Sequence, residues 1–186
     1  DHKCDIMDFD YKQNDKDYFD IIWGSPPCVE YSQLQYCWIG RMRKGELYTK
    51  EKMEENMCEA DKLVLKTLEI IDYFNVEYWF IENPNGRLKD REIMKDIPYY
   101  LVDYCMFSDW GYQKRTCIWT NKKGWETKLC DKKCGNMGGD GKHSSNLGTI
   151  SYAEIDGKLK PINTAALRKE YGHLIIKDKR KSITRE

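Results

Sequence analysis

The most informative stretch of this 186-residue chain is Gly24-Ser25-Pro26-Pro27-Cys28-Val29-Glu30-Tyr31-Ser32. It follows an apolar run, Tyr18 to Trp23, which predicts a buried strand. Two consecutive prolines cannot continue that strand, because each lacks an N–H group and has a fixed φ. The chain therefore turns out of the sheet at the carboxyl end of the strand, where open α/β sheets place their ligand crevices. Cys28 lies in this turn, although a packing cysteine after a proline turn is an equally simple interpretation.

Two later stretches repeat this design. An apolar strand at Glu77–Phe80 runs into Ile81-Glu82-Asn83-Pro84, so that an acid, an amide and a proline close the strand. Further on, Tyr112-Gln113-Lys114-Arg115-Thr116 leads into the strand-like segment 117–120. Taken singly, Glu82 is explained as a strand-end cap and Arg115 as a basic surface residue. The three stretches together, in this order and each beside a strand, indicate a common functional origin.

The ordered set resembles the motifs of the DNA cytosine-5 methyltransferases. That family carries a Pro-Cys nucleophile loop, a Glu-Asn loop after the next strand, and a Gln-x-Arg-x-Arg stretch after that. The resemblance covers roughly residues 5–121. It implies a Rossmann-like, S-adenosylmethionine-dependent methyltransferase fold of the α/β class, with a mostly parallel sheet that ends in an antiparallel hairpin. The implied reaction moves a methyl group from S-adenosylmethionine to carbon 5 of cytosine in DNA, through a covalent cysteine adduct to a flipped base.

The resemblance also assigns roles to individual residues. Cys28 is the implied nucleophile, since a thiolate that adds to carbon 6 converts the ring into an enamine. Glu82 is implied to protonate ring nitrogen 3, and Arg115 to stabilise the ring oxygen. The implied substrate-binding residues are Ser32, Asn83 and Gln113. The implied cofactor-binding residues are Asp5, Ile6 and Pro26, the first two matching an acidic-aliphatic pair that touches the adenine.

Several positions depart from the family pattern. Val29 stands where Gln is usual, Tyr31 where Phe is common, and Cys117 in place of the second motif arginine. A glycine-rich turn that holds the methionine part of the cofactor is expected before Asp5 and is not found there. We therefore expect an N-terminally truncated catalytic portion, with a missing segment or a partner chain that supplies the rest of the cofactor site.

Composition narrows the class of protein. Hydrophobic content of 40% and aromatic content of 13% fit a globular protein with a real core. No apolar run approaches the ~20 residues of a membrane span, and the first residues do not resemble a signal peptide. The eight cysteines show no compact even framework of the secreted kind. The expected setting is therefore cytoplasmic, nuclear or the interior of a viral host cell, with reduced thiols.

A zero net charge conceals a strong asymmetry along the chain. Residues 1–109 hold 14 Lys and Arg against 23 Asp and Glu, whereas residues 110–186 hold 17 against 8. The two parts thus carry −9 and +9. A segregated basic half is typical of a nucleic-acid-binding surface, because phosphate neutralisation supplies most non-specific affinity. A solvated lysine-rich surface balanced by its acidic neighbour is the alternative.

The periodicity predicts three parts: a partial catalytic core at 1–121, a short recognition-like segment at 122–162, and a helix with a basic tail at 163–186. The core contains the clearest helix, residues 51–74, with an apolar face at steps of three and four. A second helix is expected at 87–96. Strands at 99–107 and 115–120 are expected to pair as the closing hairpin. The final helix is predicted at 163–176.

The segment 122–162 also contains candidate metal ligands. Cys130, Cys134 and His143 have side chains that bind zinc, but a structural tetrahedral site needs four ligands and the sequence offers no obvious fourth. We therefore assign no metal and retain the three residues as weak candidates.

Three function classes remain open. The first is a DNA cytosine-5 methyltransferase of the phage, viral or restriction-modification type. The second is a tRNA cytosine-5 methyltransferase with the same catalytic set. The third is an inactive nucleic-acid-binding or regulatory relative that lacks cofactor binding. An amino-methyltransferase with an Asn-Pro-Pro-Tyr loop ranks below these, because that loop has neither a cysteine nor a Glu-Asn partner.

Overall fold

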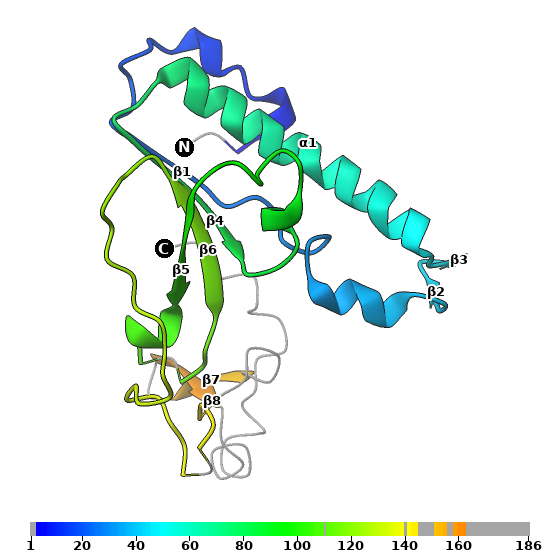
Figure 1. The fold of residues 1–186 in the computed structure, drawn as a ribbon, viewed down its shortest axis with the longest axis vertical. Helices are drawn as coiled ribbons and strands as arrows, with labels where there is room; N and C mark the ends of the chain where they lie inside the picture. The colour runs from blue at the N-terminus through cyan, green and yellow to red at the C-terminus, as the bar shows by residue number, and fades with distance from the viewer. Residues whose placement is uncertain (1–2, 110, 140, 145–150, 156–157, 163–186) are drawn as a thin grey trace. The chain divides into compact units, whose positions relative to one another are not determined.

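The computed structural model describes residues 3–109, 111–139, 141–144, 151–155 and 158–162. These residues, drawn as the coloured ribbon in Figure 1, form two compact units. Unit 1 consists of residues 1–102 and 115–127, and unit 2 of residues 103–114 and 128–186. The predicted helix at 163–176 and the basic tail lie outside the described residues.

Unit 1 is built on a four-stranded sheet with the order β1-β4-β6-β5. The strands are β1 (Ile21–Gly24), β4 (Tyr78–Pro84), β5 (Tyr99–Asp103) and β6 (Arg115–Thr120). β1 pairs with β4 in parallel, and β4 pairs with β6 antiparallel. The sheet is therefore mixed. The α/β class is confirmed, while the mostly parallel, Rossmann-like arrangement stays a prediction.

The long helix α1 (Lys50–Phe74) confirms the predicted helix at 51–74. The Thr49 side chain caps its start by accepting a hydrogen bond from the Lys52 N–H at 3.1 Å. Asn75 ends it in the left-handed conformation, with φ 47°, which Asn tolerates better than most residues. The predicted apolar face points inward, since Met53, Met57, Val64 and Ile71 are buried; Ala60 and Leu68 are partly buried beside them.

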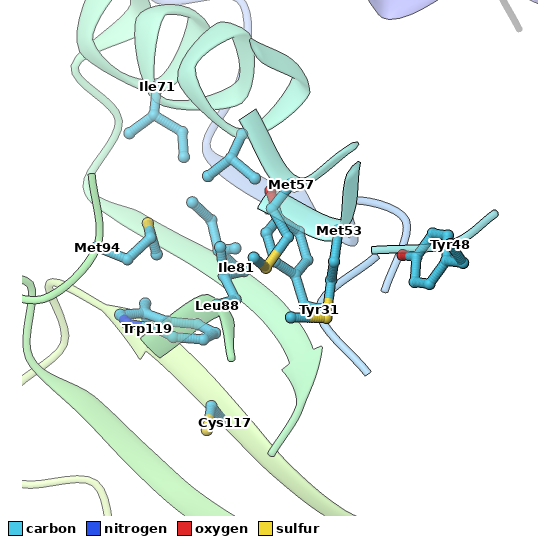
Figure 2. Close-up of a cluster of buried hydrophobic side chains, with 11 residues drawn as sticks. Tyr31, Tyr48, Met53, Met57, Ile71, Ile81, Leu88, Met94, Cys117 and Trp119 are labelled. Carbon is cyan, nitrogen blue, oxygen red and sulfur yellow. The ribbon is translucent and has the colours of Figure 1, made fainter. Parts of the chain in front are cut away.

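The main core of unit 1 lies between α1 and the sheet. Figure 2 shows Met57 and Ile71 of α1 gathered over Ile81 of β4 and Trp119 of β6. A smaller cluster joins the amino-terminal segment to the end of α1, through Tyr11, Ile70, Phe74 and Val76. That segment contains two 3-10 turns, η1 (Ile6–Asp8) and η2 (Tyr11–Gln13). The second cluster thus holds the region of Asp5 and Ile6 against α1.

The predicted second helix at 87–96 is wrong. The chain forms only a 3-10 turn, η4 (Leu88–Asp90), followed by further turns. An isolated helix of ten residues is marginal, and tertiary contacts decide such a segment. Here the Arg87 N–H donates to the Tyr31 carbonyl at 2.8 Å, and the Arg91 side chain is drawn to Asp61. These contacts fix a compact turn in place of a helix.

Residues 33–50 are partly ordered into small elements. They form η3 (Gln33–Trp38) and a hairpin of β2 (Met42–Arg43) and β3 (Glu46–Leu47). Lys44 and Gly45 connect the two strands with positive φ values of 52° and 86°, as tight hairpin turns require.

Unit 2 contains the 3-10 turn η5 (Tyr104–Met106), where the predicted strand 99–107 ends early. It also contains an antiparallel hairpin of β7 (Ser151–Ile155) and β8 (Lys158–Ile162), drawn in orange in Figure 1. This hairpin was not predicted from the sequence, although an Asp156-Gly157 pair between two apolar-alternating runs is a hairpin signature. In the described part of the chain, no helix is long and apolar enough to cross a membrane.

Candidate active site

Three strand ends meet at one edge of the sheet of unit 1. Because β1 and β4 are parallel, with Gly24 beside Ile81, their carboxyl ends lie at the same edge. β6 runs antiparallel to β4 and begins there, with Thr116 opposite Pro84. The Cys28 loop, the Glu82-Asn83 pair and Arg115 therefore all belong to this edge. Motifs separated by as many as 87 positions of sequence thus come to one side of the sheet.

Hydrogen bonds to its backbone carbonyls hold the Cys28 loop in place. The Asn83 side-chain amide donates a buried hydrogen bond of 2.9 Å to the Pro26 carbonyl, which links the loop to the end of β4. The Gln35 side-chain amide donates to the Val29 carbonyl at 2.6 Å. The Cys28 carbonyl itself accepts from the Tyr31 N–H at 3.2 Å. Cys28 is half-buried in a loop whose path is set on both sides of the thiol.

Tyr31 is deeply buried, with 1% of its surface exposed. Its hydroxyl donates to the Asp61 carboxylate at 2.9 Å, and Arg91 binds the same carboxylate with Nε at 2.9 Å. Burial and the Asp61 carboxylate raise the pKa of Tyr31. The departure from the common Phe therefore has a physical reason, because the hydroxyl completes a buried polar network. Sequence reasoning missed Asp61 and Arg91, whose pairing depends on the tertiary fold.

Gln35 is a third residue of this region that was not predicted from the sequence. It is buried, and its amide group makes three hydrogen bonds. Besides the bond to Val29, its Oε1 accepts from Arg43 at 2.6 Å and from the Tyr48 hydroxyl at 3.0 Å. One side chain thus ties the Cys28 loop to the β2–β3 hairpin. A buried amide with three satisfied partners holds its neighbours in one arrangement.

The end of β4 contributes a buried acid and a buried amide. Glu82 and Asn83 are 9% and 1% exposed. Asn83 Oδ1 has no hydrogen-bond partner within the described residues. Beside them, the Asn85 N–H donates to the Arg115 carbonyl at 2.9 Å, which ties the third motif to the second. The Arg115 side chain is exposed at this edge. Buried polar atoms without partners are rare and are expected to meet a polar ligand or water.

Cys117, which replaces the second family arginine, faces the core. It is 0% exposed and lies opposite Asn83 in the sheet register. Burial raises the pKa of its thiol to about 11. An arginine here would place a charge in the interior at high cost. Lys89 reaches the same region, and its ammonium group donates to Asn85 at 2.7 Å.

A cavity of about 480 Å³ opens beside the end of β1. Its lining includes all three predicted cofactor residues, Asp5, Ile6 and Pro26. Apolar walls come from both sides of the cavity, from Ile22, Leu63 and Ile70 among others. Gly24 is required here, since a Cβ atom on it would lie 2.7 Å from the Thr67 side chain of α1. The size and lining suit a nucleoside-sized ligand.

The two remaining predicted substrate residues lie in different units. The Ser32 hydroxyl accepts from the Leu34 N–H at 3.2 Å and caps η3. Gln113 is exposed and belongs to unit 2. In unit 2 the structure also brings the three weak metal candidates together with Cys105, which sequence reasoning did not include.

Unit 1 is thus an α/β unit with a cysteine-bearing loop, a buried acid and an arginine at one sheet edge, next to a nucleoside-sized cavity. No protein-family model matches the chain. Over 141 residues, 74% of this chain, it is 39% identical to a protein of Frog virus 3 (isolate Goorha) named a probable DNA (cytosine-5)-methyltransferase. The matched segment spans 64% of the length of that relative. The predicted resemblance to the DNA cytosine-5 methyltransferases is confirmed.

Proposed function

We propose that this protein methylates carbon 5 of cytosine in DNA, using S-adenosylmethionine and a covalent adduct to Cys28. The observation that carries the proposal is the meeting of the Cys28 loop, Glu82 and Arg115 at one edge of the sheet. The name of the Frog virus 3 relative supports DNA as the substrate. The basic second half of the chain supports phosphate contact.

The Cys28 thiolate would add to carbon 6 of a flipped cytosine. This addition makes carbon 5 electron-rich, so that one difficult substitution becomes two easier steps. After methyl transfer, loss of the carbon 5 proton and expulsion of the thiolate restore the aromatic ring and free Cys28. Such chemistry needs a thiol held in one position, which the hydrogen bonds of Asn83 and Gln35 to the loop supply.

Glu82 and Arg115 would stabilise the ring during this addition. The thiolate pushes electrons onto ring nitrogen 3, and a neighbouring carboxylic acid can donate a proton there. Glu82 is buried at the end of β4, the strand next to the one that carries the Cys28 loop. The Arg115 guanidinium, exposed at the start of β6, would bind the ring oxygen. The polar Asn83 Oδ1, buried without a described partner, is available to the exocyclic amine of the base.

The cavity lined by Asp5, Ile6 and Pro26 fits the adenosine part of S-adenosylmethionine. Its aliphatic walls suit a planar purine, and the exposed Asp5 carboxylate can accept a hydrogen bond from the exocyclic amine. When bound, the cofactor supplies an electrophilic methyl group. Pro26 and Pro27, the two residues immediately before Cys28, line the cavity. The loop that carries the thiol would therefore also bound the cofactor site.

Trapping with 5-fluorocytosine tests the proposal. Fluorine at carbon 5 blocks the final elimination, so an active protein stays covalently attached to a duplex oligonucleotide in the presence of S-adenosylmethionine. We expect the wild type to form a denaturation-resistant adduct and Cys28→Ala to form none. Cys37→Ala is a matched control, because Cys37 is an exposed cysteine of η3 and should not alter the yield. Equal yields from wild type and Cys28→Ala would reject the catalytic assignment.

A tRNA substrate is the second candidate, since the same catalytic set serves both nucleic acids. The same experiment with 5-fluorocytosine-containing tRNA distinguishes the two. An adduct with tRNA and none with duplex DNA would move the protein to the RNA class. Binding of either nucleic acid without any adduct would favour the inactive regulatory reading.

A further inference from the structure

Unit 2 gathers four metal-ligating side chains from three separate segments. Cys105 comes from η5, Cys130 and Cys134 from a tight loop, and His143 from the turn that follows. Their ligand atoms all lie within 4.8 Å of one another. We propose that these residues form a structural zinc site of the Cys3His type, which holds unit 2 together.

The distances among Cys130, Cys134 and His143 are close to those of tetrahedral coordination. Cys130 Sγ lies 3.5 Å from Cys134 Sγ, and the two sulfur atoms lie 3.5 Å and 3.3 Å from His143 Nε2. Zinc bonds of about 2.3 Å to sulfur and 2.0–2.1 Å to nitrogen give ligand–ligand separations of about 3.5–3.8 Å in a tetrahedron. The cysteines are free thiols, so no disulfide explains their approach. One metal ion at the centre accounts for all the contacts.

The backbone around the ligands is shaped for this arrangement. Lys132 adopts a positive φ of 67°, which turns the chain so that Cys130 and Cys134 face one point. Its N–H donates to Cys130 Sγ at 3.3 Å, a contact that stabilises a thiolate. A short bridge between Met137 and His143 closes the next turn and returns His143 to the cysteines. The nearby Gly138 N–H donates to the Lys142 carbonyl at 2.7 Å.

Buried hydrogen bonds attach Cys105 to the same loop. The Asn136 side chain donates to the Cys105 carbonyl at 2.8 Å and to the Ser108 carbonyl at 2.7 Å. It also accepts from the Gly111 N–H at 2.9 Å. On the other side, the Asp103 carboxylate accepts from the Cys130 N–H at 2.8 Å. The fourth ligand is therefore fixed by contacts independent of the thiols.

The metal class follows from the ligands and their number. Three thiolates and one imidazole form a soft donor set that prefers zinc over magnesium or calcium. Four protein ligands leave no open position, which is the mark of a structural site. Both hydrophobic clusters identified among the described residues lie in unit 1. In unit 2, the four described ligands come from separate segments, and a metal ion bound to them would join those segments.

Metal analysis of the full chain, purified under reducing conditions, tests the site directly. We expect about one equivalent of zinc per chain by elemental mass spectrometry. After exchange with Co²⁺, we expect visible d–d bands of tetrahedral intensity and a near-ultraviolet thiolate-to-cobalt charge-transfer band. Reduced wild-type protein without zinc and without these bands would overturn the proposal, and this measurement requires no variant.

Variants then assign the ligands. Cys105→Ser and Cys134→Ser should each lower the zinc content at least ten-fold after dialysis against a mild chelator, roughly the loss expected from disrupting a site. His143→Cys keeps four ligands, so it should retain metal and strengthen the thiolate-to-cobalt band. Cys58→Ser, at an exposed cysteine of α1 outside the cluster, should leave zinc unchanged. Zinc content that is the same in all four variants would show adventitious binding and reject the site.

Discussion

Asn83 at the end of β4 donates a 2.9 Å buried hydrogen bond to the carbonyl of Pro26, two residues before Cys28. The two residues are 57 positions apart in the chain, and the bond links the Glu-Asn motif to the Pro-Cys motif. Because the φ of Pro26 is fixed, a hydrogen bond to its carbonyl also restricts the backbone that leads to Cys28. Asn83 is thus a positioning residue for Cys28 on structural grounds, besides its implied role toward the substrate.

Replacing this amide should impair both stability and adduct formation. Asn83→Leu removes the donor and leaves the Pro26 carbonyl buried without a partner, which costs about 1–3 kcal/mol of unfolding free energy. We expect a lower midpoint of urea denaturation and slower trapping by 5-fluorocytosine. Asn14→Leu is a control, because the Asn14 side chain donates a local 3.4 Å hydrogen bond to the carbonyl of Tyr11, three residues earlier in the chain. Unchanged trapping kinetics in Asn83→Leu would contradict the positioning role.

Gly86 should not tolerate a side chain. A Cβ atom there would lie 2.5 Å from the Tyr31 carbonyl oxygen, a contact with backbone that cannot rotate away. Gly86→Ala should therefore destabilise the protein by about 1–3 kcal/mol and displace the Cys28 loop. Thermal unfolding measures the first effect and adduct yield the second. Gly139→Ala, where a Cβ atom meets nothing within 4 Å, should change neither.

Stability should fall at alkaline pH through Cys117. Burial raises the pKa of this thiol from its ordinary 9.0 to about 11. The native state therefore holds its proton more tightly than the unfolded chain, so the stabilisation is complete below pH 9 and is lost as the pH rises toward 11. We expect a slope of about 1.4 kcal/mol per pH unit across this window from Cys117.

Cys117→Val tests that slope, since valine fills a similar volume and does not titrate. Urea denaturation at several pH values from 8 to 10 should show a flatter decline for the variant than for the wild type. Tyr31, whose pKa is also raised, adds a further decline above its ordinary 10.0 in both proteins. Identical slopes below that pH would mean that Cys117 does not contribute.

Asp5 should govern cofactor affinity without affecting the fold. Asp5→Asn keeps an oxygen for the Met7 N–H, which Asp5 accepts at 2.9 Å, but removes the charge that faces the cavity. A hydrogen bond to a charged group contributes about 1.5–3 kcal/mol, so affinity for S-adenosylmethionine should fall about ten-fold or more. Isothermal titration calorimetry measures this loss. The same change at Asp8, an exposed acid that does not line the cavity, should leave affinity unaltered.

Local sequence signals accounted for much of unit 1. The helix at Lys50–Phe74 and the strands before the three motifs were predictable, because apolar periodicity reports directly which face of an element is buried. The order of the motifs was enough to indicate a resemblance to the DNA cytosine-5 methyltransferases, and the comparison with the Frog virus 3 protein confirms that resemblance. The helix predicted at 87–96 failed because its ten residues had too little propensity to resist the contacts of Arg87 and Arg91.

The residue types of the candidate site could be recognised in the sequence, whereas the tertiary structure decided which of them lie close together. Parallel pairing of β1 with β4, and the reversed direction of β6, bring Cys28, Glu82 and Arg115 to one edge. A local sequence pattern predicts neither the order nor the direction of the strands in a sheet. The same holds for Cys105. Its sequence context predicts a strand residue, but the fold places it beside Cys130, Cys134 and His143 as the fourth ligand of the proposed zinc site. The chemistry of each side chain is determined by the sequence alone. Which side chains act together is determined by long-range packing, which must offset the entropy of closing long loops.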